Sequence, residues 1–508
     1  DDEYAFVDAS DSHDSYTFNG RTYTLDSTNR YATISAAVAA KKKVLVILPG
    51  VYNEKITVGQ SCAILGPHYG VSPNNADMSL NTEWAVTPTG TDNRYTFDST
   101  KEAVLSNYIY ITNTGSHVQF DGLVANKLEI YIHSSSYTTE KSGRMYYVFL
   151  DNMFVQNEDQ HLVSGLGSVS ATSIGIQNAK RYDYFNEIRM ESVKDKFGAL
   201  VSSGAQVIDI NRVYVHGMNS GAVIATHASA GKYVLLSPDK TGIKVTNSTF
   251  EDCGNNGNWI YPNYVNMDVA TTWGQTPQST PEFFPNGFYE IFDNNTFINQ
   301  ASAGCGQKGY VLRLTYADGK HTKLQVTNNT VVNDTVTDAR FIDAAYSNFT
   351  ACQGPSEWNV SGNTFVNYTE PVRAFDKNSE TLYNIDENYF AFIEDGKEVV
   401  KTITAKETNA VEKSDWYYLN RAQTVKSTDV SLDITDVLPN ANVIGFPEWK
   451  ITGDFACAVT SFDASQIKGT EKTTVLGVYK EAACTTPLTE NITELNFFVK
   501  VQVEDVTV

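Results

Sequence analysis

Long hydrophobic runs and an excess of positive charge are both missing from this chain of 508 residues. No stretch approaches the roughly 18 consecutive apolar residues that a membrane-spanning helix needs. Lys and Arg number 38 against 59 Asp and Glu, which gives a formal net charge of -21. A chain this acidic repels phosphate backbones and anionic lipid surfaces. We therefore expect no nucleic-acid partner and no membrane insertion.

The six cysteines lack any CxxC pair and any Cys/His spacing typical of a zinc site, so thiolate-bound metal is disfavoured. Their even number permits disulfides, and the first pairs to test are Cys457 with Cys484 and Cys305 with Cys352. Buried thiols are the alternative. Sequons make the following residues candidates for N-glycosylation: Asn247, Asn294, Asn328, Asn333, Asn348, Asn359, Asn367 and Asn491.

One pattern repeats along the middle of the chain: a short apolar strand, an Asn-containing corner and a second short strand. Val326 and Val331 lie five positions apart, so an unbent strand would place them on opposite faces, and the chain must bend between them. A propeller would need four strands per blade, and a sandwich would not preserve the corner. The pattern predicts the coils of a parallel β-solenoid. Its copies are 245–253 (VTNSTFEDC), 292–300 (FDNNTFINQ), 326–334 (VTNNTVVND), 360–368 (VSGNTFVNY) and 385–393 (IDENYFAFI).

The corner residues predict a ladder between coils. We expect Asn295, Asn329 and Asn363 to stack, each amide bonding to the next coil while its own backbone adopts the left-handed conformation. Such a ladder would fix the register of neighbouring coils.

The N-terminal region carries a resemblance to a known superfamily. A short amphipathic helix over 31–40 is followed by Leu48-Pro49-Gly50-Val51-Tyr52-Asn53-Glu54-Lys55-Ile56 and by Ile64-Leu65-Gly66. This order resembles the start of the right-handed parallel β-helices of the pectin lyase-like superfamily, and with the repeats the resemblance covers about residues 30–395. It implies an all-β fold: a right-handed, single-stranded parallel β-helix with an N-terminal capping helix, followed by a small C-terminal antiparallel β domain.

These patterns divide the chain into four parts. Residues 1–30 form an N-terminal strand or hairpin segment, and residues 31–396 form the β-helix. Residues 397–426 are charged and read as a connector. Residues 427–508 alternate apolar and polar positions, as a small sandwich-like antiparallel domain does.

Catalytic signatures of the enzymes in this superfamily are lacking. The chain has no counterpart of the QDTL, DFIFG and LGRPW strings of pectin methylesterases, nor of the NTD and DD motifs of polygalacturonases. We expect Tyr52 and Glu54 to be structural, because the same string opens noncatalytic β-helices. No cofactor is predicted with certainty; calcium remains open, since acidic residues are common but no recognisable oxygen-ligand loop occurs.

Weak catalytic candidates come from the stacking of repeats. Gln156, His216 and Asp252 each follow the Phe-type position of their copies by two residues, so they are expected in one outward column, and Asp209 lies upstream in the coil of His216. A carboxylate near a His-Gly pair is similar to part of the polygalacturonase-like site. The alternative is an exposed polar column with no catalytic role.

An insertion between Phe250 and Phe297 gathers aromatic residues among Asn, Gly and Pro. Its rings suit the apolar faces of sugars. A local core or a subunit interface is the alternative. The ligand-binding candidates are Trp259, Tyr261, Trp273 and Phe284.

The function predicted from the sequence is that of a secreted or cell-surface (extracellular) β-helix glycoprotein for carbohydrate binding, adhesion or extracellular structural assembly. The expected partners are a polysaccharide or glycan, other surface proteins, or further copies of the chain. The rival prediction is a polysaccharide-active enzyme, a lyase or glycosidase before an esterase, working in the solenoid groove.

Overall fold

The computed structural model describes most of the chain. It describes residues 3–112, 117–132, 145–165, 180–202, 207–218, 223–227, 242–253, 265–268, 288–299, 310–315, 322–337, 340–343, 357–368, 372–373, 382–386, 388–394, 397–399, 416–425, 430–433, 443–451, 456–462, 473–487 and 492–503. The chain forms two compact units: unit 1 consists of residues 1–289 with 302–307, and unit 2 consists of residues 290–301 with 308–508.

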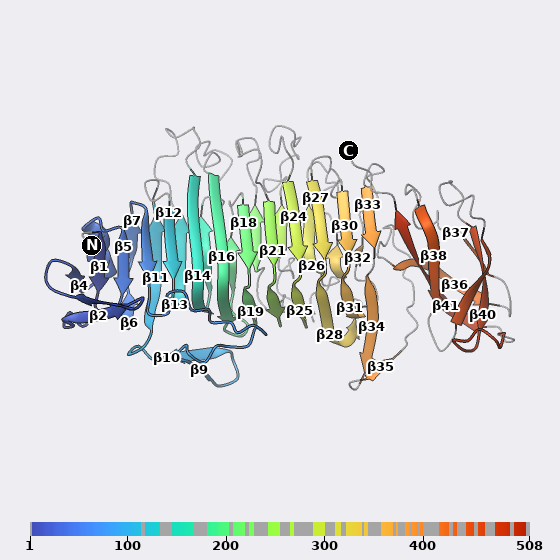
Figure 1. Ribbon diagram of the computed structural model, residues 1–508, viewed down its shortest axis with the longest axis horizontal. Coiled ribbons are helices and arrows are strands. Elements are labelled where there is room, and N and C mark those ends of the chain that lie inside the picture. The colour runs from blue at the N-terminus through green and yellow to red at the C-terminus, as the bar shows by residue number, and fades with distance from the viewer. Residues whose placement is uncertain are drawn as a thin grey trace. The chain divides into compact units, whose positions relative to one another are not determined.

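Unit 1 is built of short strands that stack in parallel, with the antiparallel hairpins β2–β3 and β9–β10 added to the stack (Figure 1). The strands are β1 (Tyr4–Val7), β2 (Ser15–Phe18), β3 (Arg21–Thr24), β4 (Arg30–Tyr31), β5 (Val44–Ile47), β6 (Gly50–Asn53), β7 (Ile56–Val58), β8 (Cys62–Leu65), β9 (Val86–Thr89), β10 (Arg94–Phe97), β11 (Ala103–Ile111), β12 (His117–Asp121), β13 (Val124–Ile132), β14 (Met145–Asn157), β15 (Gln160–Gly165), β16 (Lys180–Ser192), β17 (Gly198–Ser202), β18 (Val207–Asn211), β19 (Tyr214–His216), β20 (Ile224–His227), β21 (Gly242–Thr246), β22 (Thr249–Glu251) and β23 (Val265–Asp268).

The predicted corners are present. Residues at the bends of successive coils have positive φ: Asn152 at 48°, Glu187 at 54°, Arg212 at 54° and Asn247 at 53°. After each bend the chain continues as a strand whose inward side chains stack in register. Val155, Met190, Val215 and Phe250 form one such buried column. The bend therefore lets both strands of a coil point apolar side chains into the same core.

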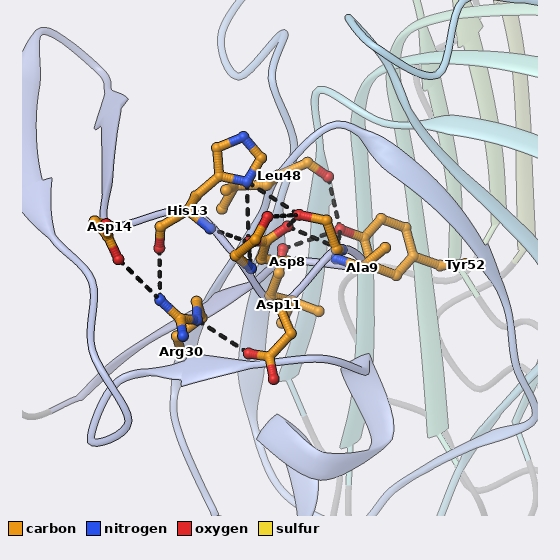
Figure 2. Close-up of polar contacts among 11 residues, drawn as sticks. Asp8, Ala9, Asp11, His13, Asp14, Arg30, Leu48 and Tyr52 are labelled. Carbon is orange, nitrogen blue, oxygen red and sulfur yellow. Dashed lines mark hydrogen bonds and ion pairs between the residues drawn. The ribbon is translucent and has the colours of Figure 1, made fainter.

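The N-terminal end is closed by helix α1 (Ile34–Ala39) and by the motif that carries the resemblance. Both carboxylate oxygens of Glu54 accept from the helix N-terminus, at 2.9 Å from the Ile34 nitrogen and 3.1 Å from the Ser35 nitrogen. The buried hydroxyl of Tyr52 accepts from the Ala9 N–H at 3.2 Å and lies 2.8 Å from the Leu48 carbonyl oxygen (Figure 2). Tyr52 and Glu54 are thus structural, as the sequence indicated.

A turn beside Tyr52 is held by one buried carboxylate. Asp8 accepts from the backbone N–H groups of Ser10, Ser12 and His13 at 3.1, 3.0 and 2.9 Å, and its Oδ2 lies 2.9 Å from His13 Nδ1 (Figure 2). Burial alone would raise the pKa of Asp8, but hydrogen bonds from the Ser10 hydroxyl, at 2.7 Å, and from His13 and Ser12 bring it well below its usual range. The turn that follows β1 is therefore held by local hydrogen bonds.

Unit 2 continues the same construction and then changes to antiparallel pairing. In its parallel part Phe297, Val331, Phe365 and Phe390 are in register, as the repeats predicted. Its elements are β24 (Phe288–Asp293), which begins at the unit boundary, β25 (Thr296–Ile298), β26 (Tyr310–Thr315), β27 (Thr322–Thr327), β28 (Thr330–Thr337), β29 (Arg340–Asp343), β30 (Glu357–Ser361), β31 (Thr364–Tyr368), β32 (Val372–Arg373), β33 (Leu382–Asp386), β34 (Tyr389–Glu394), β35 (Lys397–Val399), β36 (Trp416–Val425), β37 (Val430–Asp433), β38 (Val443–Ile451), β39 (Ala456–Phe462), β40 (Thr473–Tyr479) and β41 (Ile492–Val503).

The C-terminal region consists of two three-stranded antiparallel sheets, ordered β36-β41-β38 and β37-β40-β39. The predicted fold class, an all-β parallel β-helix with a capping helix and a C-terminal antiparallel region, is confirmed. Two details differ. Strand β36 lies inside the stretch 397–426 that reads as a connector, and pairs with β41. The proposed Cys457–Cys484 disulfide is wrong: Cys484 is a free thiol in a turn, and Cys457 lies opposite Val478. Cys305 and Cys352 lie outside the described residues.

The asparagine ladder is present in unit 2, with one correction. The Oδ1 atoms of Asn329, Asn363 and Asn388 each accept the backbone N–H of the ladder residue one coil before, at 2.9, 2.9 and 3.0 Å, and Asn295 begins the series. The side-chain amides of the first three residues reach the same acceptors at 3.1, 2.9 and 2.8 Å. The left-handed backbone, however, belongs to the preceding residues, Asn294, Asn328 and Gly362. Bending and bonding are therefore separate tasks of neighbouring residues.

This division predicts opposite tolerances at adjacent positions. Asn329→Ala removes the acceptor of the buried Asn295 N–H, and should cost about 1–3 kcal/mol of stability. Asn328→Gly should cost little, because glycine accepts positive φ freely, whereas Asn328→Val should strain the backbone by roughly 1–2 kcal/mol. Melting temperatures of the full chain measure all three. Equal shifts for Asn329→Ala and Asn328→Gly would contradict the division.

In unit 1 two carboxylates lie in register next to the corner, Asp121 on β12 and Asp151 on β14. Asp121 Oδ1 accepts from the Gly70 N–H at 3.0 Å and from Asn152 Nδ2 at 3.1 Å. Burial is the main cause that raises the pKa of Asp121 to about 6 from 3.8, with a contribution from the charge of Asp151. Ionised Asp121 therefore destabilises the folded state.

Asp121→Asn should raise the melting temperature at neutral pH. Because the pKa of Asp121 is raised in the folded state, its contribution to the free energy of unfolding is most favourable below about pH 4. That free energy falls as the pH rises through about 6, by up to about 3 kcal/mol. Asparagine keeps the acceptor oxygen and removes the charge, so the gap between variant and wild type should shrink as the pH falls from 7.5 to 4. A gap that does not depend on pH would mean that Asp121 is not the group responsible.

Candidate functional site

The outward column that contains His216 lies on the strands after the corner of unit 1. Gln156, Glu191, His216 and Glu251 occupy equivalent positions on β14, β16, β19 and β22. The comparison of the repeats predicts Asp252 in this column, and that prediction is wrong by one residue. The residues equivalent to Phe250 in the earlier copies are Val155 and Val215 rather than their neighbours Phe154 and Tyr214.

His216 nevertheless contacts Asp252 as well as Glu191. Its Nδ1 lies 2.6 Å from Glu191 Oε2, and its Nε2 lies 3.4 Å from Asp252 Oδ2. The backbone of Asp252 has a positive φ, as at a bend. Side-chain exposure rises along this line from 3% at Glu191 through 23% at His216 to 53% at Asp252. The imidazole thus has one nitrogen held by a buried carboxylate and the other on the solvent side.

The charge of His216 follows from these neighbours. Burial lowers its pKa, but the hydrogen bond and charge of Glu191, with the charges of Glu251 and Asp252, outweigh burial, so that the pKa is raised. The neighbouring carboxylates therefore favour the protonated imidazole, which can donate a hydrogen bond to a ligand.

Glu191 is held by two further groups, Tyr95 and Arg189. The Tyr95 hydroxyl donates to its Oε1 at 3.2 Å, and Arg189 Nε lies 3.6 Å from the same oxygen. The Arg189 guanidinium stands over the Tyr214 ring at 3.9 Å, and its Nη1 donates to the Met78 carbonyl at 2.8 Å. These contacts compensate the buried charge of Glu191 and set the position of the imidazole above it.

Residues 67–101 form an insertion between β8 and β11, which provides Tyr95 through the hairpin β9–β10. Trp84 and Val86 of this insertion pack on the coil residues Val104, Val124 and Phe154. The five residues form a buried cluster between the insertion and the coils. The insertion also reaches the site at Asn93, whose Nδ2 donates to the Ser192 carbonyl at 3.2 Å.

The glycine after His216 is explained by this contact. Gly217 has φ of 74°, and a Cβ there would stand 2.4 Å from Asn93 Nδ2. The His-Gly pair therefore reflects the close approach of the insertion to the coil.

Asp209 is not part of this cluster. It lies on β18, before the corner, in register with Tyr184 and Lys244. Burial raises the pKa of Asp209, and the charge of Lys244 opposes that shift. Of the three catalytic candidates, the structure brings together His216 and Asp252. Glu191 was not among the catalytic candidates, although its place one coil before His216 in the same column was the signal that could have found it.

The aromatic ligand-binding candidates Trp259, Tyr261, Trp273 and Phe284 all lie outside the described residues. So do the sequons at Asn348 and Asn491. Among the other sequons, Asn247, Asn294 and Asn328 are exposed at bends, and Asn359 is half-buried in β30. Asn333 and Asn367 are buried, so they cannot carry a glycan in the folded chain.

The corner itself accounts for the exposed sequons. A left-handed Asn, a ladder residue and a Thr that starts the next strand give the string Asn-Asn-Thr at Asn294 and at Asn328. Asn328 Nδ2 donates to Asp293 Oδ1 at 3.3 Å, so its amide already bonds to the neighbouring coil. These sequons arise from the fold whether or not glycans are attached.

Within the part of the chain that the structure describes, no cluster of three or more His, Cys, Asp or Glu has the arrangement of a metal site. Calcium thus stays a prediction without a located site. In the same described residues, no helix has the length and hydropathy to cross a membrane.

Comparisons with known proteins give no family. No family model matches the chain, and no curated protein matches it. A solved structure, the tailspike gp61 of Pseudomonas phage phi297, aligns over 93% of this chain and 92% of its own length. The identity is 8% and the TM-score 0.17, which is too low to transfer either fold or function.

Proposed function

We propose that this chain is a secreted or cell-surface parallel β-helix, of the pectin lyase-like type, that binds a glycan on the outer face of unit 1. The observation that supports this most directly is the end of the polar column, where His216, Glu251 and Asp252 present a donor and two acceptors on neighbouring coils. Sugars are recognised by such convergent polar groups.

The geometry favours an extended ligand with repeated hydroxyls. Neighbouring coils lie about 4.8 Å apart, so successive polar side chains follow one another along the stacking direction. Glu251 is oriented by the Tyr214 hydroxyl, which donates to its Oε2 at 2.5 Å, and Asp252 is half exposed. Because the exposed charges here are mainly negative, neutral polysaccharides should bind better than uronates.

The aromatic insertion adds a second component to this proposal. In the sequence it follows Glu251, Asp252 and Cys253. Trp259, Tyr261, Trp273 and Phe284 would supply flat apolar surfaces beside the polar groups. An adhesive or assembly role, with a surface protein or another copy of the chain as partner, is the alternative use of the same surface.

Retention on insoluble neutral polysaccharides tests the proposal. We expect Trp259→Ala, Trp273→Ala and Asp252→Ala each to reduce retention at least tenfold, about 1.4 kcal/mol, while the melting temperature changes by only a few degrees. Asp209→Ala is the matched control, because it removes a carboxylate from the strand before the corner, and it should bind as the wild type does.

Two results would count against the glycan site. Loss of retention together with a large fall in melting temperature for the Trp variants would assign their rings to a local core. Equal losses for Asp252→Ala and Asp209→Ala would show that general charge, and not the column at His216, governs binding.

A further inference from the structure

The Glu191–His216 pair has a feature that binding does not require. Nδ1 is committed to a carboxylate that is 3% exposed, and Nε2 is directed to the solvent side. A buried carboxylate that orients an imidazole in this way fixes its tautomer and stabilises the imidazolium that forms when Nε2 takes a proton. Here Nε2 is the one reactive atom of the pair.

A single proton-transfer atom restricts the class of reaction. Displacement at a sugar carbon needs two groups on opposite faces, roughly 5 to 9.5 Å apart. Glu191 and Asp252 lie on either side of the imidazole, so the ring occupies the space between them. In ester hydrolysis, the water attacks and the sugar oxygen leaves at the same tetrahedral carbon. One imidazole nitrogen can therefore take the proton in the first step and return it in the second.

We propose that the Glu191–His216 pair hydrolyses ester substituents, such as O-acetyl groups, on the glycan bound at this face. The inference rests on the proposed function, which supplies the glycan ligand. The ester chemistry is inferred from the Glu191–His216 pair itself. Neutral Nε2 takes a proton from water as the water oxygen bonds to the acyl carbon. The tetrahedral intermediate then expels the sugar oxygen, which receives that proton from Nε2, leaving a carboxylic acid and a free hydroxyl.

The surrounding residues have distinct roles. His216 is the catalytic residue, and Glu191 is a positioning residue held by Tyr95 and Arg189. Asp252 faces Nε2 at 3.4 Å from an exposed position, so a water molecule can take its place beside Nε2.

The pH dependence has a defined sign. Glu191, Glu251 and Asp252 favour the imidazolium, while Arg189, Tyr95 and Tyr214 are the other titratable groups packed around the pair. Since the base must be neutral, the rate should rise with pH through the pKa of His216.

Acetate release from acetylated xylan and hydrolysis of 4-nitrophenyl acetate by the full chain test this inference. His216→Gln should lower the rate by roughly 10²- to 10⁴-fold on both esters. Glu191→Gln should move the midpoint of the pH profile to lower pH, because the charge that favours the imidazolium is gone. Tyr95→Phe removes the hydroxyl that donates to Glu191 and keeps the ring against Phe154. It should shift the midpoint of the pH profile by less than Glu191→Gln does, and it is the second variant to use if Glu191→Gln does not fold. Asp209→Asn is the control and should match the wild type.

The outcomes separate the two proposals. Hydrolysis of 4-nitrophenyl acetate that depends on His216, without retention on any polysaccharide, would sustain the pair and overturn the glycan site. Retention on polysaccharide with no ester hydrolysis sensitive to His216 would overturn the pair alone. An unchanged pH midpoint in both Glu191→Gln and Tyr95→Phe would remove Glu191 from its positioning role.

Discussion

The bend between the two strands of each coil is the constraint on which the rest of this structure depends. Without it, side chains five positions apart would point to opposite faces, and no common core could form. One residue makes the bend through positive φ, as Asn328 does, and the next fixes the coil to its neighbour, as Asn329 does. In unit 2 the coils from Asn295 to Asn388 repeat this arrangement, so their register is set by buried amide hydrogen bonds as well as by the core.

A fixed register turns outward side chains into columns. Gln156, Glu191, His216 and Glu251 come from segments spread over nearly a hundred residues, yet they follow one another from coil to coil. The contact of His216 with a buried carboxylate on one side and an exposed one on the other is a consequence of that stacking. The polar column and the oriented imidazole both result from the same regular backbone.

The insertion of residues 67–101 makes one end of this column different from the other. Its apolar residues pack on Val124 and Phe154, and Tyr95 reaches Glu191. The earlier part of the column is therefore covered, while His216 and Asp252 remain partly exposed. This cover keeps Glu191 buried, and burial strengthens its hydrogen bond to the imidazole of His216.

The sequence by itself determined the repeat, the corner and the cap. Asn-rich corners at a spacing of 34 residues, and the Tyr52–Glu54 string, are local patterns whose physical meaning needs no knowledge of distant residues. The left-handed position was misplaced by one residue because Asn suits both the bend and the ladder, and composition cannot tell Asn328 from Asn329. Only the tertiary structure decided which residues share a column: the alignment of Phe154 with Phe250 looked natural by side-chain type, but strand pairing set Val155 there instead. That shift of one residue exchanged Asp252 for Glu251 in the column. It could not be read from the sequence, because register depends on hydrogen bonds between coils and on the insertion that packs across them.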